Sequence, residues 1–205
     1  METRLAKDYF ISPIAVDTLK VKPSEQELVR KAQNGDKNAF KELIVQNEQR
    51  VAATVIGMLG NCPEADDVGQ ETFIRFYRSL AKFRGESSIG TYLTRIAINL
   101  SLNELKLRKR RSTHFFSRGE EKMANAHDKK DRKSAKELKE IVRMGLEQLD
   151  PKYRAVVVLR MIEGHSTKET AQILCLPIGT VLSRLARAQK RLKEILTPLY
   201  WETNV

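Results

Sequence analysis

The stretch from Asp150 to Leu196 constrains the fold most, because helix start and stop signals follow one another closely within it. Asp150 directly precedes Pro151, a pair typical of a helix start. Gly164 suits the left-handed residue that ends such a helix. Together these signals predict one short helix before a turn.

A second and a third helix follow in the same stretch. Ser166 with Glu169 three residues later forms a capping box, and the helix it opens ends at about Leu174, because Pro177 interrupts the chain. The third helix has one apolar stripe at helical spacing: Val181, Leu185, Ala188, Leu192 and Leu196. Its other side carries Ser183, Arg184, Arg187 and Arg191. Two helices joined by a tight break, with arginines on the second, are typical of a helix-turn-helix.

A plain helical hairpin with solvated arginines is the alternative interpretation of this pattern. The segment Pro177-Ile178-Gly179-Thr180 favours DNA binding, because it leaves the start of the last helix small enough for its free N–H groups to meet a phosphate.

Charge supports a polyanionic partner. The chain has a net charge of +11 and a pI near 9.7, which favours nucleic acid over a membrane surface. It has no apolar run of about 18 residues and no secretory signal pattern, so we expect a cytoplasmic protein without membrane insertion.

Cysteine and histidine usage predicts no disulfide framework, metal or cofactor. Cys62 and Cys175 lie far apart, and we expect both to be reduced. His114, His127 and His165 show no ligand spacing with them.

Helix signals also fill the first half of the chain after residues 1–23, which have no clear period. Ser24 with Glu27 suggests a capping box, Asp36 caps the next helix, and Pro63 starts another that runs to about Lys82. Their apolar positions are Phe40, Leu43, Ile44, Val51, Val55 and Leu59, then Val68, Thr72, Phe76 and Leu80.

The helix expected from about Ile89 to Arg108 follows a loop, Phe83–Ser88, whose last residue caps it. One face, predicted to join the core, carries Leu93, Ile96, Ala97, Leu100 and Leu107. Another carries the polar stripe, defined as Arg95, Asn99 and Asn103. Asparagine is a mediocre helix former, so the stripe reflects either tolerance at the surface or a function. In the functional interpretation, the arginine meets phosphate and the amides contact base edges.

Composition changes between Lys106 and Lys136, where basic residues dominate and the apolar period is lost. A solvated spacer and a basic strand lying along nucleic acid are both compatible with this stretch. Leu138 then restarts a helical period. We therefore expect an all-α chain of two small helical domains joined by a basic flexible linker. The expected order is an extension at 1–23, a first domain at 24–108, a linker at 109–134 and a second domain at 135–200.

Five segments, in this order, resemble extracytoplasmic-function (ECF, group IV) sigma factors of the sigma-70 family. Asp66–Phe73, Phe83–Ser88 and Tyr92–Asn99 are similar to the family's second conserved region, while Leu149–Arg154 and Leu176–Leu185 resemble its fourth. The resemblance implies a non-enzymatic, dissociable subunit of bacterial RNA polymerase. Its first domain would open and hold the promoter −10 element, and its second would dock at −35.

The resemblance also implies site residues. The expected −10 contacts are Arg84, Ser87, Ser88, Arg95, Asn99 and Asn103. The expected −35 contacts are Ile178, Gly179, Thr180, Ser183, Arg184 and Arg187. The expected grip on the clamp helices of the polymerase largest subunit comes from Asp66, Asp67, Gln70, Glu71 and Phe73. The fourth region would meet the polymerase flap, and the linker would thread toward the active-site channel and RNA exit path.

Some residues depart from the family pattern: Gly69, Gly90, Tyr92 and Cys175. Acidic residues in a first helical turn are also favoured by the helix dipole alone. A stand-alone helix-turn-helix regulator of duplex DNA is the alternative function, although it would not need the polar stripe. Family members are commonly held inactive by an anti-sigma factor, and the sequence leaves open whether this chain has one.

Overall fold

The computed structural model describes residues 23–116 and 135–202, and that part of the chain is helical without a strand. This confirms the predicted all-α fold. The elements are α1 Glu25–Gln33, α2 Lys37–Leu59, α3 Pro63–Leu80, α4 Ile89–Phe116, α5 Ala135–Gln148, α6 Pro151–Val157, the π-helical turn η1 Val158–Ile162, α7 Thr167–Leu174 and α8 Ile178–Glu202. The extension at 1–22 and the linker residues 117–134 lie outside the described residues.

Most of the predicted helix starts are present. The Asp36 carboxylate accepts hydrogen bonds from the first turn of α2, and the Asp150 carboxylate accepts one from Lys152 N at 3.0 Å. Ser166 and Glu169 form the complete capping box. Only half of the other box forms: Ser24 caps α1, but the Glu27 carboxylate pairs with Lys31 on the next turn instead.

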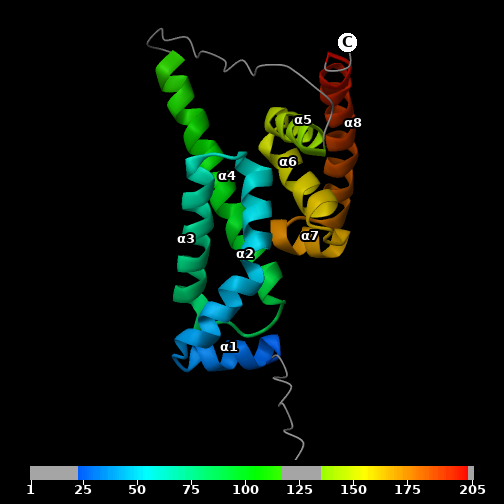
Figure 1. Cartoon of the computed structure of the whole chain (residues 1–205). Coiled ribbons are helices and arrows are strands. Elements are labelled where there is room, and N and C mark those ends of the chain that lie inside the picture. The colour runs from blue at the N-terminus through cyan, green and yellow to red at the C-terminus, as the bar shows by residue number, and fades with distance from the viewer. Residues whose placement is uncertain (1–22, 117–134, 203–205) are drawn as a thin grey trace, which may run out of the picture.

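The first lobe is built on three long helices. Figure 1 shows α2, α3 and α4 side by side, with α1 lying across one end of them. Large apolar side chains from each helix fill the space between them and are fully buried, among them Leu28, Leu43, Phe76 and Leu93. The ridge predicted on α3 points into this core.

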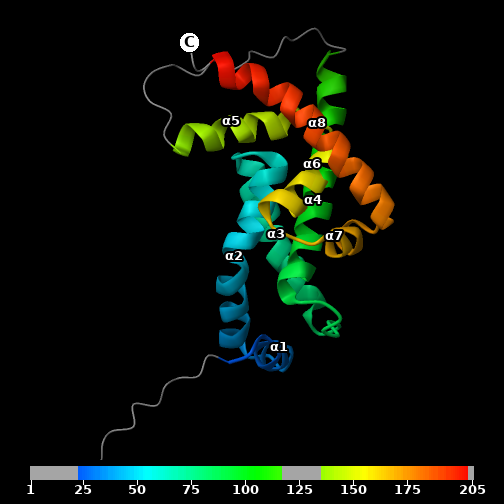
Figure 2. The same ribbon diagram turned by 90° about the vertical axis from the view of Figure 1, so that its right-hand side faces the viewer.

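The second lobe contains α5 to α8. Figure 2 shows α5 and the C-terminal part of α8 at the end of the molecule opposite α1. Two apolar clusters hold the lobe together. Ala188 and Val181 of α8 are completely buried, while Leu185 and Leu196 are half-buried. The predicted apolar stripe on the last helix is therefore confirmed.

Helix α4 differs from its sequence prediction in length and in its buried face. It continues to Phe116 rather than ending at Arg108. No glycine or proline interrupts it there, and Arg108 forms ion pairs with Glu104 of α4 and Glu64 of α3. The prediction that Leu107 joins the core is wrong, because its side chain is 44% exposed. Ile98, by contrast, is completely buried.

The two lobes share one hydrophobic core. Helix α7 packs on α4, and η1 packs on α2. Val158, Leu159 and Ile173 of the second lobe belong to the same buried cluster as the core of the first. The approach is close at Gly57 of α2, where a Cβ atom would lie 3.0 Å from Val158 Cγ2. The described lobes therefore form one packed body.

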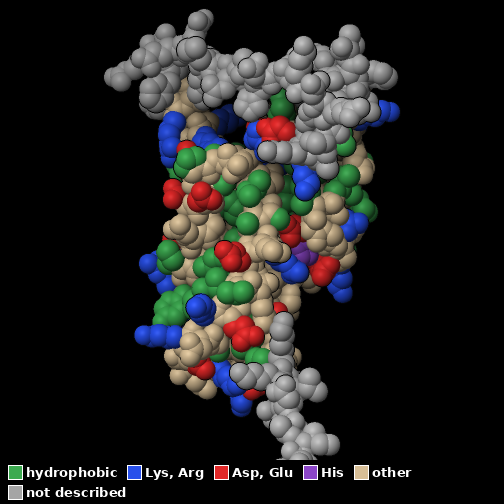
Figure 3. Space-filling model, in the orientation of Figure 1, with side chains coloured by type: hydrophobic (Ala, Val, Ile, Leu, Met, Phe, Trp, Pro, Cys, Tyr) green, Lys and Arg blue, Asp and Glu red, His purple; other side chains and the backbone are tan. Residues whose placement is uncertain are grey.

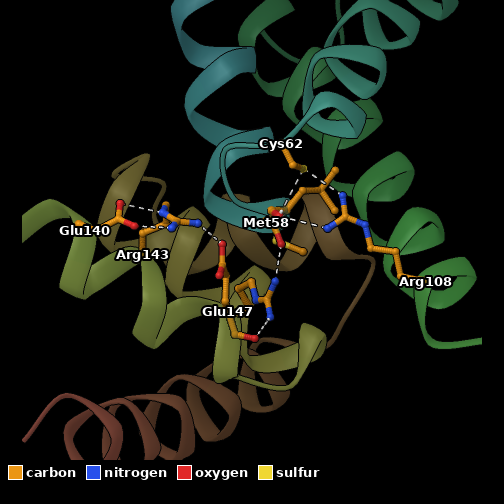
Figure 4. A network of polar contacts seen from close by, with 8 residues as sticks. Met58, Cys62, Arg108, Glu140, Arg143 and Glu147 are labelled. Atoms are coloured by element: carbon orange, nitrogen blue, oxygen red, sulfur yellow. Dashed lines mark hydrogen bonds and ion pairs between the residues drawn. The ribbon is translucent and has the colours of Figure 1, made fainter. Parts of the chain in front are cut away.

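A polar network crosses the contact between the lobes (Figure 4). The guanidinium of Arg154 on α6 donates to the Met58 carbonyl of α2 and, within its own lobe, to the carbonyls of Glu147 and Leu149. Burial lowers the pKa of Arg154, and its three carbonyl acceptors satisfy much of its donor capacity. On the other side, Arg108 donates to the Leu59 carbonyl at 3.3 Å. Two arginines thus cap the carbonyl end of α2, where the helix dipole favours positive charge.

No described helix combines the length and the hydropathy needed to cross a bilayer. Within the same residues, no group of three or more His, Cys, Asp or Glu side chains is placed to hold a metal ion.

We predict that Arg154→Met lowers the free energy of unfolding by about 3 kcal/mol, because three carbonyls, among them buried acceptors, lose a charged donor. Urea unfolding measures this change. Arg78→Met removes an exposed arginine of α3 and serves as the matched control, with a change within about 0.5 kcal/mol. Equal stability of the two variants would contradict a structural role for the buried arginine.

Candidate nucleic-acid interface

The polar stripe of α4 lies opposite the buried arc of that helix. At about 100° per residue, the buried residues Leu93, Thr94, Ala97, Ile98, Leu100 and Ser101 cover nearly half of the helix circumference. The stripe falls on the remaining side. Asn99 and Asn103 are exposed, and neither amide has a hydrogen-bond partner among the described residues. Both amides are therefore free to form hydrogen bonds with a ligand, as donors and as acceptors.

Arg95 begins the stripe and is less accessible than the two asparagines. Its side chain is half-buried, and its Nε atom is buried without a partner. It is one of eight buried side-chain polar atoms without a partner among the described residues, so it does not by itself indicate a ligand.

The loop Phe83–Ser88 lies between α3 and α4. The Ser88 hydroxyl accepts a hydrogen bond from Thr91 N at 3.2 Å, so it caps α4 as predicted. Gly85 has φ +74° and open space around it, while Arg84 is exposed. A cavity of about 370 Å³ separates the loop from α1, and Arg84 and Ser87 line it.

Two departures from the family pattern shape this end of α4. The Arg50 guanidinium of α2 lies over Gly90, where a Cβ atom would come within 2.0 Å of Arg50 Nη1. The glycine therefore makes room for the arginine. The Tyr92 ring packs edge-on against Phe83 at 5.1 Å between ring centroids and also meets Phe76. Tyr92 thus packs against the first residue of the loop.

The helix-turn-helix is formed by α7 and α8. Cys175 ends α7 with φ +51°, the only positive φ of a non-glycine residue in the described chain. This explains why glycine suits that position. Of the predicted −35 residues, Ile178, Gly179, Ser183 and Arg187 are exposed, while Thr180 and Arg184 are half-buried. The Ser183 hydroxyl already donates to the Thr180 carbonyl at 3.1 Å.

Burial between the lobes changes the pKa values of Glu163 and His165, which directly precede α7. Desolvation raises the pKa of Glu163 and lowers that of His165. Arg50 acts on both groups from α2: it lowers the pKa of Glu163 and also that of His165. Burial thus shifts both side chains toward their neutral forms where the helix-turn-helix meets the first lobe.

The predicted polymerase-contacting residues lie on α3. Asp66, Asp67 and Gln70 are exposed, and Glu71 is half-buried and pairs with Arg75 at 2.8 Å. Phe73 differs from these four, because its ring packs against the core of the first lobe. The structure therefore gives Phe73 a packing role.

Two apolar residues on the exposed face of α3 were missed by the sequence analysis. Ile74 is 44% exposed and Tyr77 62%, and both follow Asp66 and Gln70 at helical spacing. Figure 3 shows hydrophobic side chains gathered between charged ones on the face over α2 and α3. The signal was present in the sequence as apolar residues outside the ridge that fills the core.

Comparison with known proteins identifies both lobes. Residues 43–111 match the family described as Sigma-70 region 2, and residues 139–192 match Sigma-70, region 4. The RNA polymerase sigma-H factor of Pseudomonas aeruginosa is 35% identical over 186 residues, covering 87% of this chain and 96% of that protein. The chain belongs to the ECF group of the sigma-70 family.

Other relatives agree with this assignment. The ECF RNA polymerase sigma-E factor of Escherichia coli K12 is also 35% identical, over 86% of this chain and 96% of its own. The structure of CnrH in complex with the cytosolic domain of CnrY matches with a TM-score of 0.61 and 26% identity, covering 84% of this chain and 96% of that one. The sigma factor RpoE of Bartonella quintana, solved with the anti-sigma factor NepR, has the same TM-score at 23% identity. The match covers 77% of this chain and 96% of that one, and it supports the fold alone.

As an ECF sigma factor, the chain directs core RNA polymerase to specific promoters and helps to open the −10 element. The alternative of a stand-alone helix-turn-helix regulator is not favoured, because the first lobe belongs to the family as well.

Proposed function

We propose that the polar stripe and the 83–88 loop hold unpaired bases of the −10 element. The observation that carries this proposal is the pair of free amides at Asn99 and Asn103, exposed on a helix whose opposite side is buried. A protein shifts DNA from closed to open only if it binds the open form more tightly. Amides on a rigid helix beside a cavity can contact bases that have left the stack.

In the same proposal, α8 contacts the −35 element in the major groove. Arg184 and Arg187 make no ion pair within the described residues, so their guanidinium groups are available to guanine or phosphate. Thr180 and Gly179, at the start of the helix, lie where backbone N–H groups can meet a phosphate. Ile178 and Ser183 complete the exposed face.

Core polymerase would bind the outer face of α3. Asp66, Asp67 and Gln70 supply charge and polarity there, and Ile74 and Tyr77 supply apolar surface that is otherwise exposed to water. We propose the clamp helices of the largest subunit as the partner of this face, and the flap as that of the second lobe. We further propose that the chain acts in the cytoplasm, as an initiation factor without catalytic activity of its own.

An anti-sigma factor is a further proposed partner. CnrH, which matches this chain over most of its length, was solved in complex with the cytosolic domain of CnrY. The shared core of the two lobes in this chain gives an inhibitor one compact body to hold.

We predict that Asn99→Ala and Asn103→Ala each weaken binding of the polymerase holoenzyme to a promoter fork with an unpaired −10 strand by about tenfold. Affinity for a duplex carrying only the −35 element should stay unchanged. Fluorescence anisotropy with labelled DNA measures both. Asn38→Ala, an exposed amide at the start of α2, is the matched control. Parental affinity of both stripe variants for the fork would refute the proposed role.

We further predict that Arg187→Ala changes the salt dependence of −35 duplex binding. If this exposed arginine holds a phosphate, the slope of log affinity against log salt falls by about 0.9. An unchanged slope with altered base preference would assign it to base contact instead. A variant that matches the parent in both respects would remove Arg187 from the interface.

A further inference from the structure

We propose that α1 braces the 83–88 loop, and that Gln33 and Glu25 are positioning residues for −10 recognition. This inference rests on the proposed role of that loop in holding unpaired bases. Helix α1 lies outside residues 43–111, the part of the first lobe that matches Sigma-70 region 2. Figures 1 and 2 both show it lying beside the loop that joins α3 to α4.

Gln33, the last residue of α1, fixes the start of the loop. Its amide Nε2 donates to the Leu80 carbonyl at 3.0 Å and to the Phe83 carbonyl at 2.9 Å. These two carbonyls belong to the last turn of α3 and to the first residue of the loop. The backbone bonds Lys82 N to Ser79 O and Phe83 N to Leu80 O form the turn itself, and Gln33 ties that turn to α1.

Glu25, at the other end of α1, fixes the end of the loop. Its carboxylate accepts a hydrogen bond from Ile89 N at 3.0 Å, the first residue of α4. Ser88 satisfies another orphan donor of that helix, Thr91 N, at 3.2 Å. A carboxylate at a helix N-terminus is also favoured by the helix dipole. The loop is thus held at both ends by side chains of α1.

Little else holds the loop. Within the described chain, residues 84–87 make no hydrogen bond, and Gly85 adopts a left-handed conformation with open space around it. The Phe83 ring on Tyr92 supports one side. On the other side lies the cavity of about 370 Å³, lined by Gln33, Glu25 and the loop. The shape of this cavity depends on α1.

A loop fixed before DNA arrives binds more tightly and more selectively, because less ordering is needed on binding. Loss of the brace should therefore reduce discrimination between −10 sequences while leaving the −35 and polymerase contacts intact. A structural role alone would lower all three together through unfolding.

The test uses Gln33→Glu in the full chain with core polymerase. The substitution keeps the side-chain shape but turns the amide donor into a carboxylate facing two carbonyl oxygens. The affinity ratio between forks with the matched and a scrambled unpaired −10 strand should fall by about tenfold. Affinity for core polymerase and for a −35 duplex should match the parent. Gln49→Glu, an exposed residue of α2, controls for the added charge.

Three further variants keep the inference open to refutation. Gln33→Met removes the donors without adding charge, and it should show the same loss of −10 discrimination. It takes the place of the glutamate variant if that variant does not fold. Glu25→Gln keeps an oxygen acceptor for Ile89 N and should retain most discrimination, whereas Glu25→Ala should lose it.

The outcomes separate this inference from the proposed function. If the parent binds forks with matched and scrambled −10 strands equally well, the proposed function itself is refuted. A discriminating parent matched by both Gln33 variants would overturn the brace. Parallel losses of affinity for the −10 fork, the −35 duplex and core polymerase would also overturn it, because they would show that α1 only stabilises the fold.

Discussion

The arrangement of this molecule depends on one constraint on α4: the helix must be buried by two lobes and still leave one side free. Its buried arc packs against α2, α3 and α7, so both lobes cover it. Asn99 and Asn103 stay exposed on the uncovered side. Burial on the opposite side keeps the helix rigid, and a rigid helix can present two amides to a ligand at fixed spacing.

The carbonyl end of α2 is where the lobes meet. Arg154 from the second lobe and Arg108 from α4 both donate to carbonyls of its last turn. A buried guanidinium needs good acceptor geometry to offset its desolvation, and its removal leaves buried acceptors without a donor. Apolar side chains such as Val158 supply the burial around it. The contact between the two lobes thus combines buried polar and apolar groups.

Much of this fold was predictable from the sequence because its helix boundaries carry local signals. Asp36, Asp150 and the Ser166–Glu169 box cap their helices as expected. Long-range contacts carry no local signal, so the sequence did not reveal that Ile98 is completely buried or that the lobes share a core. The sequence analysis also placed Leu107 in the core, because its spacing continues the apolar face of α4. Spacing alone does not reveal whether another element covers that end of the helix. Helical spacing identified the polar stripe and the arginines of the last helix, and the family resemblance gave them roles and supplied the other site residues. The contacts of Gln33 and Glu25, by contrast, appear only in three dimensions.

The most direct test of the account installs a photo-cross-linking side chain in place of Asn103 in the full-length protein bound to core polymerase. The account predicts a covalent link to an unpaired strand of the −10 element, formed only when the promoter is open. The same group in place of Gln49, exposed on α2, should give no link to that strand. Cross-linking only to duplex DNA, or only within the protein, would contradict the claim that this side of α4 holds unpaired bases.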